Sequence, residues 1–307
     1  ADEVLERPCH PYTRALIAAV PPLAPAASRH AVAADAPNIL TTQALSKTYR
    51  KRGWFGQPGR VTHALDDVTL ALREGSTLGI VGESGSGKST LARSLLGLLA
   101  PDAGAITLAG DTVTFKGSRA RREHARRVQM VFQDPYGSLN PRQRVGEIVA
   151  RGPIVHGMPR REAWAQAREL FELVGLSPDA LRRYPHEFSG GQRQRVGLAR
   201  ALAMRPRVLI ADEPVSALDV SVQAQVLALL ARLREQLGLS IVFITHDLRV
   251  AAQVCDHIAV MKNGQVVEQG PCAEVFAAPA HPYTRALLAA VPGRRWDSDA
   301  AAARQAA

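Results

Sequence analysis

The chain has 307 residues, of which 46% are hydrophobic and 21% are charged, and this composition excludes disordered, collagen-like and disulfide-scaffold chains. No stretch approaches the roughly 18 consecutive apolar residues that a membrane-spanning helix needs. Lys and Arg outnumber Asp and Glu by 38 to 28, so a nucleic acid or an anionic membrane must be considered as a partner. The three cysteines lie far apart in no metal-ligand spacing, which favours a reducing compartment.

The two ends of the chain share an internal repeat. Residues 1–21 align with residues 272–292, and fourteen of the 21 aligned positions are identical, including the run H-P-Y-T-R-A-L. Nothing between the two copies repeats, so the pattern indicates the tail of one domain at 1–21, followed by a complete second domain with its own tail. Residues 22–37 are rich in Ala and Pro without apolar periodicity, which is typical of an extended linker. We therefore expect the second domain at 38–270 and its tail at 271–307.

A glycine-rich loop lies between a predicted strand, Leu78 to Val81, and a helical pattern that begins at Lys88. The spacing Gly82-x-x-x-x-Gly87-Lys88-Ser89 fits a phosphate-binding loop in its proper setting. In such a loop backbone N–H groups and the helix N-terminus surround the phosphates, the lysine reaches the β- and γ-phosphates, and the serine binds Mg²⁺. The predicted nucleotide-binding residues of the loop are Gly82, Glu83, Ser84, Gly85, Ser86, Gly87, Lys88, Ser89 and Thr90.

Two helical patterns follow, at 161–174 and 192–203, within a segment from 136 to 205 that is poor in β-branched runs. The second helix is preceded by the short sequence F-S-G-G-Q at 188–192. We therefore expect this segment to form a separate helical part of the molecule.

Two further apolar strands end in polar side chains. Val208 to Ala211 lead to Asp212 and Glu213, and Ile241 to Thr245 lead to His246. Because the carboxyl ends of parallel strands meet at one edge of a sheet, we expect these groups to lie beside the glycine-rich loop. One acid can serve a metal ion there and the next a water molecule.

Taken in order, these motifs resemble those of the ATP-binding cassette (ABC) ATPases over roughly 38–270. The signature sequence of that family is usually L-S-G-G-Q, and this chain departs from it only in Phe188. The resemblance implies an α/β fold, with a P-loop NTPase (RecA-like) core, an antiparallel β-subdomain and an inserted α-helical subdomain at about 136–205. It also implies that the helical subdomain engages a membrane partner and that the loop around Gln133 is its hinge.

The resemblance further implies roles for single residues. Ser89, Gln133 and Asp212 would hold Mg²⁺ beside the phosphates. Glu213 would be the general base for the attacking water, and His246 would orient the γ-phosphate, with Lys88 and Gln133 completing the catalytic group. Tyr49 would stack on adenine, although it could instead be a core aromatic, and Trp54 or Phe55 compete for the role. Two such domains bind head to tail in this family, so the signature residues would serve the opposite site: Ser189, Gly190, Gly191 and Gln192.

The second tail, H-P-Y-T-R-A-L-L-A-A-V-P, resembles the ending of ATPases of bacterial oligopeptide and dipeptide importers, whose relatives import glutathione or nickel complexes. Some relatives carry two ATPase domains on one chain, so the repeat predicts the C-terminal half of a tandem fusion. The implied partners are a second ABC ATPase domain, two transmembrane permease subunits and an extracytoplasmic solute-binding protein. The implied location is the cytoplasmic face of the bacterial inner membrane. Neither tail carries the cysteine cluster of some members, so we expect no iron–sulfur cluster.

The competing hypothesis is a nucleic-acid-associated ABC ATPase. The charge of +10 and the Arg-rich segment 119–127 favour it, because arginine side chains can contact phosphates. Glu123 interrupts that segment and few aromatic residues accompany it, which favours a solvated face at a membrane surface instead. Nucleic-acid cassettes also carry long coiled-coil insertions or two full cassettes with a characteristic linker, and this chain has neither. The transported solute itself cannot be read from these motifs.

Overall fold

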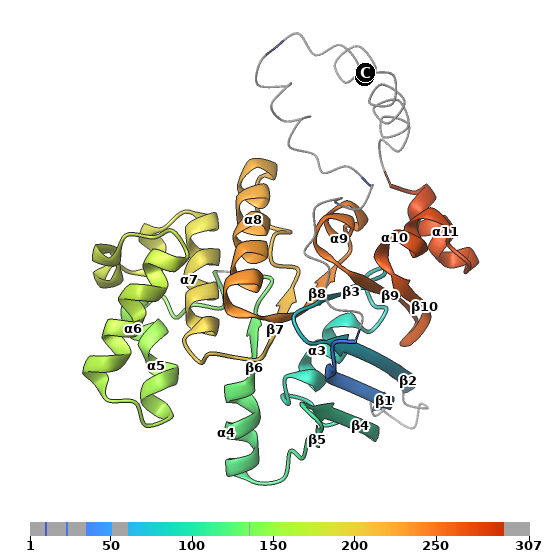
Figure 1. Cartoon of the computed structure of the whole chain (residues 1–307), viewed down its shortest axis with the longest axis horizontal. Coiled ribbons are helices and arrows are strands. Elements are labelled where there is room, and N and C mark those ends of the chain that lie inside the picture. Colours follow the sequence, from blue (N-terminus) through green and yellow to red (C-terminus); the bar gives the residue numbers. More distant parts are fainter. Residues whose placement is uncertain (1–9, 11–22, 24–34, 51–60, 135, 292–307) are drawn as a thin grey trace, which may run out of the picture.

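The structure is a computed structural model that describes residues 10, 23, 35–50, 61–134 and 136–291. The first copy of the repeat and most of the predicted linker lie outside the described residues, as do Trp54 and Phe55. The described chain folds into two sheets with helices around them (Figure 1). None of the helices in these ranges is long and apolar enough to cross a membrane.

The smaller sheet has four strands, arranged β2-β1-β4-β5, and every neighbouring pair is antiparallel. Buried and more exposed residues alternate along the second half of β2 and the end of β4, so one face packs on the core while the other is turned to solvent. Its elements are β1 (Asn38–Arg50), β2 (Val61–Arg73), β4 (Ala103–Leu108) and β5 (Asp111–Thr112).

The larger sheet has six strands in the order β10-β9-β3-β8-β7-β6. Only β10 is antiparallel to its neighbour, and β3 and β8 are buried along their whole lengths, as parallel strands covered on both faces should be. The three strands predicted from the sequence are the adjacent strands β3, β8 and β7. The elements are β3 (Thr77–Val81), β6 (Val128–Val131), β7 (Val208–Asp212), β8 (Ser240–Thr245), β9 (His257–Lys262) and β10 (Gln265–Pro271).

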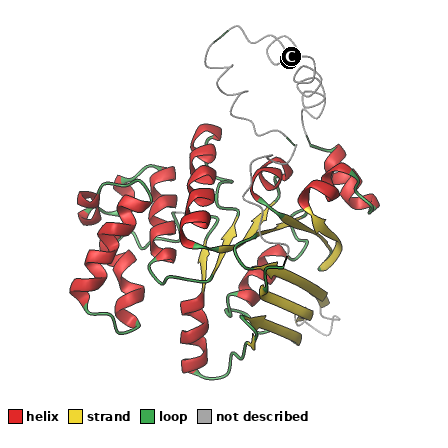
Figure 2. Cartoon of the chain, in the orientation of Figure 1, coloured by secondary structure: helices red, strands yellow, loops and turns green. Residues whose placement is uncertain are grey.

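The helices divide into groups that differ in position (Figures 1 and 2). Helices α5 to α7 lie together on one side of the larger sheet, and the four-stranded sheet lies on the other side. The elements are α3 (Lys88–Leu95), α4 (Ser118–Arg127), α5 (Val145–Val155), α6 (Arg160–Leu173), η1 (Pro178–Arg182), η2 (Pro185–Glu187), α7 (Gly190–Leu202), α8 (Val220–Leu237), α9 (Leu248–Val254), α10 (Cys272–Ala277) and α11 (Pro282–Ala289). The two helical patterns predicted from the sequence correspond to α6 and α7.

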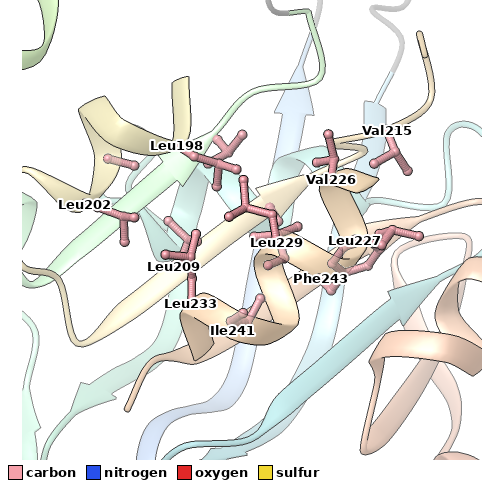
Figure 3. Close-up of a cluster of buried hydrophobic side chains, with 14 of the residues drawn as sticks. Leu198, Leu202, Leu209, Val215, Val226, Leu227, Leu229, Leu233, Ile241 and Phe243 are labelled. Carbon is pink, nitrogen blue, oxygen red and sulfur yellow. The ribbon is translucent and has the colours of Figure 1, made fainter. Parts of the chain in front are cut away.

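A continuous core joins α7 and α8 to the larger sheet (Figure 3). Leu229 and Leu233 of α8 pack among Leu209 of β7 and Phe243 of β8, and all four side chains are buried. Burying a leucine or phenylalanine side chain contributes about 1.5–3 kcal/mol, so this cluster fixes α8 firmly on the sheet. Asp212 at the end of β7, and the segment from Glu213 to α8, are thereby held between two packed elements.

Candidate nucleotide-binding site

The glycine-rich loop connects β3 to α3 and is closed by Lys88. The ammonium of Lys88 donates to the carbonyl oxygens of Gly82 at 2.7 Å and of Glu83 at 2.8 Å. Burial lowers the pKa of Lys88, although Glu213, Asp212 and Glu83 oppose this shift through their charges. The loop therefore holds a buried cation whose donors are satisfied by main-chain oxygens that an incoming phosphate could replace.

Backbone geometry explains the glycine at position 82. Its φ is 150°, and a Cβ atom there would lie only 2.2 Å from the carbonyl oxygen of Met261 at the end of β9. Gly264 donates its N–H to the Ser86 carbonyl at 2.9 Å, so the turn after β9 holds the loop from the same side. Only a residue without a side chain allows the loop this close to the neighbouring strand.

Glu213 lies at the centre of a group of polar side chains from three segments. Its Oε2 accepts a hydrogen bond from Gln133 Nε2 at 2.8 Å, and its Oε1 lies 3.1 Å from His246 Nδ1. Gln133 follows β6 and His246 follows β8, so strand order in the sheet brings the three side chains together. The carboxylate is mostly covered, whereas the His246 side chain is 60% exposed.

Asp212, the last residue of β7, lies next to Glu213 in a low-dielectric setting. Burial and then the charge of Glu213 raise the pKa of Asp212, and Lys88 and Arg93 act in the opposite direction. A buried carboxylate whose pKa is raised beside a second carboxylate is a setting in which a divalent cation would favour the ionised form of Asp212. Ser89 is exposed at the start of α3, so its hydroxyl is available as a further oxygen ligand. These residues fit Mg²⁺, which takes few protein oxygens and completes its shell with water and phosphate oxygens.

A cleft of about 840 Å³ opens over the loop. It brings together all four catalytic residues predicted from the sequence, with residues from β2 and the turn after β9 that no motif pointed to. Its lining residues are Val61, Thr62, His63, Ala64, Ser84, Gly85, Gly87, Lys88, Ser89, Thr90, Gln133, Glu213, His246 and Asn263. The β2 residues and Asn263 carry no sequence signal, because only the packing of the small sheet against the loop places them there.

Tyr49 does not line this cleft. It lies on β1, opposite Thr62 of β2, and its side chain is 40% exposed. The segment between these two strands falls outside the described residues. Stacking of Tyr49 on adenine thus stays a prediction.

The signature residues do not line the cleft of their own chain either. The Ser189 side chain caps α7 by accepting from the Gln192 N–H at 3.3 Å, and Gln192 Oε1 accepts from the Ser189 N–H at 3.0 Å. This capping box satisfies two main-chain donors and leaves Ser189 and Gln192 exposed. The N-terminus of α7 thus exposes Ser189 and Gln192 to solvent, together with the partial positive charge of the helix start.

Two family descriptions match this sequence. Residues 65–216 match "ABC transporter", and residues 1–59 and 267–306 match "Oligopeptide/dipeptide transporter, C-terminal region". A peptide import ATP-binding protein of Brucella ovis is 46% identical over 87% of this chain and 82% of its own length. The glutathione import ATP-binding protein GsiA of Escherichia coli is 42% identical over 95% of this chain and 51% of its own length. The oligopeptide transport ATP-binding protein OppD of Mycobacterium bovis is 48% identical over 86% of this chain and 44% of its own length.

Solved structures agree with the sequence relatives. A dimeric bacterial ABC transporter cassette superposes with a TM-score of 0.67 at 30% identity, covering 76% of this chain and 98% of that one. The cassette cbiO1 of Clostridium perfringens, part of an ABC transporter complex, gives a TM-score of 0.66 at 29% identity, covering 78% and 91%. The fold class inferred from the sequence is therefore confirmed.

Proposed function

The chain belongs to the ABC transporter family, and from this premise we propose that it is the ATP-hydrolysing subunit of a bacterial importer of peptides or related small solutes. The observation that carries the proposal is the Glu213 carboxylate, held between Gln133 and His246 beside a phosphate-binding loop. A nucleotide in this cleft would have its phosphates on the loop and the Glu213 carboxylate beside its terminal phosphate. The relatives that import peptides, oligopeptides and glutathione support this solute class.

Each residue has a distinct part in the proposed hydrolysis. Lys88 exchanges its bonds to loop carbonyls for bonds to phosphate oxygens and neutralises their charge. Glu213 accepts the proton of the attacking water, and His246 orients the terminal phosphate. Mg²⁺, when bound by Ser89, Gln133 and Asp212, would supply further neutralisation of the charge on the phosphates.

Glu213 has the geometry that a general base requires. A carboxylate offers about four acceptor positions, and Gln133 and His246 fill one on each oxygen. Each oxygen therefore retains room for a water molecule, while the two contacts prevent rotation of the group. Proton transfer by a side chain fixed in this way contributes about 10²–10⁴-fold to the rate.

The proposal includes a second cassette, because the Ser189 end of α7 is exposed and absent from the cleft of its own chain. The dimeric form of a solved relative supports such an assembly. We place that cassette N-terminally on the same polypeptide, and the match of one family description to both residues 1–59 and residues 267–306 supports this. Two permeases, a solute-binding protein and a peripheral position at the inner membrane complete the proposed machine.

The test replaces Glu213 by Gln in the assembled transporter. The amide keeps the shape of the side chain but cannot accept the proton, so ATP turnover should fall by about 10²-fold or more. The affinity for ATP should stay within about twofold of that of the unchanged protein, since the phosphate-binding loop is intact. Steady-state phosphate release and equilibrium nucleotide binding measure the two quantities.

Two variants serve as controls. Glu123→Gln makes the same chemical change at an exposed position on α4, outside the cleft, and should leave turnover unchanged. Lys88→Ala should abolish ATP binding itself. Undiminished ATP hydrolysis by the Glu213→Gln transporter would show that the proton acceptor is another group.

A further inference from the structure

The tail helix α11 is attached firmly to the edge of the larger sheet. Glu268 of β10 accepts hydrogen bonds from the main-chain N–H groups of Ala280 at 2.7 Å and His281 at 3.0 Å. The His281 ring then caps the helix by accepting from the Tyr283 N–H at 3.1 Å. The first turn of α11, which carries the H-P-Y-T-R motif, is thus held in one orientation beside β9 and β10 (Figure 1).

This attachment directs Tyr283 at the phosphate-binding loop. The Tyr283 side chain is buried, and the Lys262 ammonium at the end of β9 lies 4.6 Å from its ring centroid. The phenol oxygen accepts a hydrogen bond from the Glu83 N–H at 3.2 Å, a contact between residues 200 positions apart. The tail therefore reaches the main chain of the loop.

Glu83 connects this contact to the essential lysine. Its N–H donates to Tyr283, and its carbonyl oxygen accepts from the Lys88 ammonium at 2.8 Å. Glu83 itself is exposed and follows Gly82, the residue with the tightest fit against β9. A shift of the Glu83 main chain would thus displace one of the two carbonyls that hold Lys88.

We propose that Tyr283 is a positioning residue of the ATP site, which acts through the Glu83 main chain on the phosphate-binding loop and Lys88. The tail thereby sets the affinity for the nucleotide, and removal of α11 from the sheet would weaken ATP binding. This inference rests on the proposed function, because it assigns a role within the same site. The run of seven identical residues, 10–16 and 281–287, that the two copies of the repeat share includes this tyrosine.

The decisive variant is Tyr283→Phe in the full chain, because it keeps the ring and its contact with Lys262 and removes only the hydroxyl. Loss of one hydrogen bond of this kind corresponds to about a threefold to tenfold change in an equilibrium constant. We expect the Kd for ATP, and the KM for ATP in the assembled transporter, to rise by that factor. A positioning role leaves kcat within about twofold, whereas a merely structural role reduces the fraction of folded enzyme and lowers kcat at unchanged KM.

The controls separate this inference from the proposed function. Tyr184→Phe makes the same chemical change where the ring stacks on His186 instead, and it should leave the Kd for ATP unchanged. If Lys88→Ala binds ATP as tightly as the unchanged chain, the proposed site is wrong. If Lys88→Ala loses ATP binding but Tyr283→Phe binds ATP normally, only the role of Tyr283 is wrong.

A second measurement needs no variant. Coupling between two sites is reciprocal. If docking of the tail raises the affinity for ATP by some factor, bound ATP must raise the equilibrium constant for docking of the tail by the same factor. Amide hydrogen exchange within Pro282–Ala289 should therefore slow by about threefold to tenfold when ATP saturates the unchanged chain. If the amide exchange rates in this helix are the same with and without ATP, the proposal is wrong. This outcome is decisive even if the Tyr283→Phe chain fails to fold.

Discussion

Glu213 adopts a left-handed backbone conformation, with φ at 45°, although it carries a side chain. Such a conformation costs on the order of 1–3 kcal/mol and persists only where the surroundings enforce it. Here the Glu213 N–H donates to the Ile244 carbonyl at 2.9 Å, which holds the residue against β8. In this conformation the carboxylate contacts Gln133 and His246. The backbone strain therefore lowers the stability of the fold slightly, while the proposed base is held in a fixed position.

Gly82 also has a positive φ, but it has no side chain, which lets the loop lie close to β9. Substitution of Gly82 by Ala tests this close approach. In Gly82→Ala the new Cβ must displace the Met261 carbonyl, which belongs to main chain and cannot rotate away. Crowding of this kind costs about 1–3 kcal/mol, and the positive φ adds about 1 kcal/mol. Urea denaturation without nucleotide should show both losses.

The matched control is Gly75→Ala. Gly75 also has a positive φ, 72°, but a Cβ there would meet nothing within 4 Å. It should therefore lose only the conformational part, about 1 kcal/mol. Equal losses of unfolding free energy in the two variants would mean that crowding against the Met261 carbonyl adds no destabilisation to Gly82→Ala.

Two kinds of pattern made site residues predictable from the sequence: a motif within one loop, and apolar strands that end in polar residues. Gly82, Glu83 and Lys88 lie within a single loop, so the motif alone identified these residues, although it did not specify the hydrogen bonds from Lys88 to the two carbonyls. The sequence assigned no role in the site to Tyr283, because its partner is 200 positions away and no local pattern describes how a helix docks. The H-P-Y-T-R motif shared by the two copies of the repeat was the available signal for Tyr283. It draws attention to the residue but does not show which residue it contacts.

At the scale of elements, the site depends on strand order. Placing β7 and β8 beside β3 brings Asp212, Glu213 and His246 to the edge where the phosphate-binding loop begins. Apolar runs that end in polar residues predicted this edge, since parallel strands share a direction. Strand β2, whose first residues form one wall of the cleft, was not linked to the site by any motif, because its placement follows from packing between two sheets.

A buried ion pair attaches α8 to this sheet, and it makes a second stability test. Arg234 of α8 lies 2.7 Å from Asp256, which also accepts from the Thr77 N–H at the start of β3. The two side chains are only 9% and 15% exposed. Asp256→Ala would leave the guanidinium without its counter-ion and should lower the free energy of unfolding by about 3 kcal/mol.

An exposed ion pair of similar length supplies the control. Arg207 and Glu74 are 2.8 Å apart, but their side chains are 49% and 42% exposed. Glu74→Ala should cost less than about 1 kcal/mol, because solvent screens the pair. A double variant, Arg234→Met with Asp256→Ala, should be more stable than the sum of the single losses predicts. Additive losses would mean that the two side chains do not interact.

For the whole molecule, the main feature is that the two groups of residues proposed to form an ATP site lie apart on one chain. The cleft lies over the loop after β3, whereas Ser189 and Gln192 are exposed at the start of α7 and do not line it. The motifs identified both groups, the family resemblance implied that they serve opposite sites, and in the described chain the signature residues lie outside the cleft. A second cassette is the simplest way to unite them.

Ser189→Asp tests this arrangement. Aspartate caps helices as well as serine does, so the α7 capping box and the melting temperature should be preserved. Its negative charge would face the phosphates of the nucleotide on the other cassette, and repulsion should reduce ATP hydrolysis by the assembled transporter at least tenfold, or about 1.4 kcal/mol. The Kd for ATP of the isolated chain should not change, because the cleft of that chain lacks Ser189.

The control variant is Ser177→Asp, at the cap of η1, which should alter neither the rate of ATP hydrolysis nor the Kd for ATP. A weakened Kd in the isolated Ser189→Asp chain would mean that the signature serves its own cleft, and unchanged hydrolysis would mean that it serves neither.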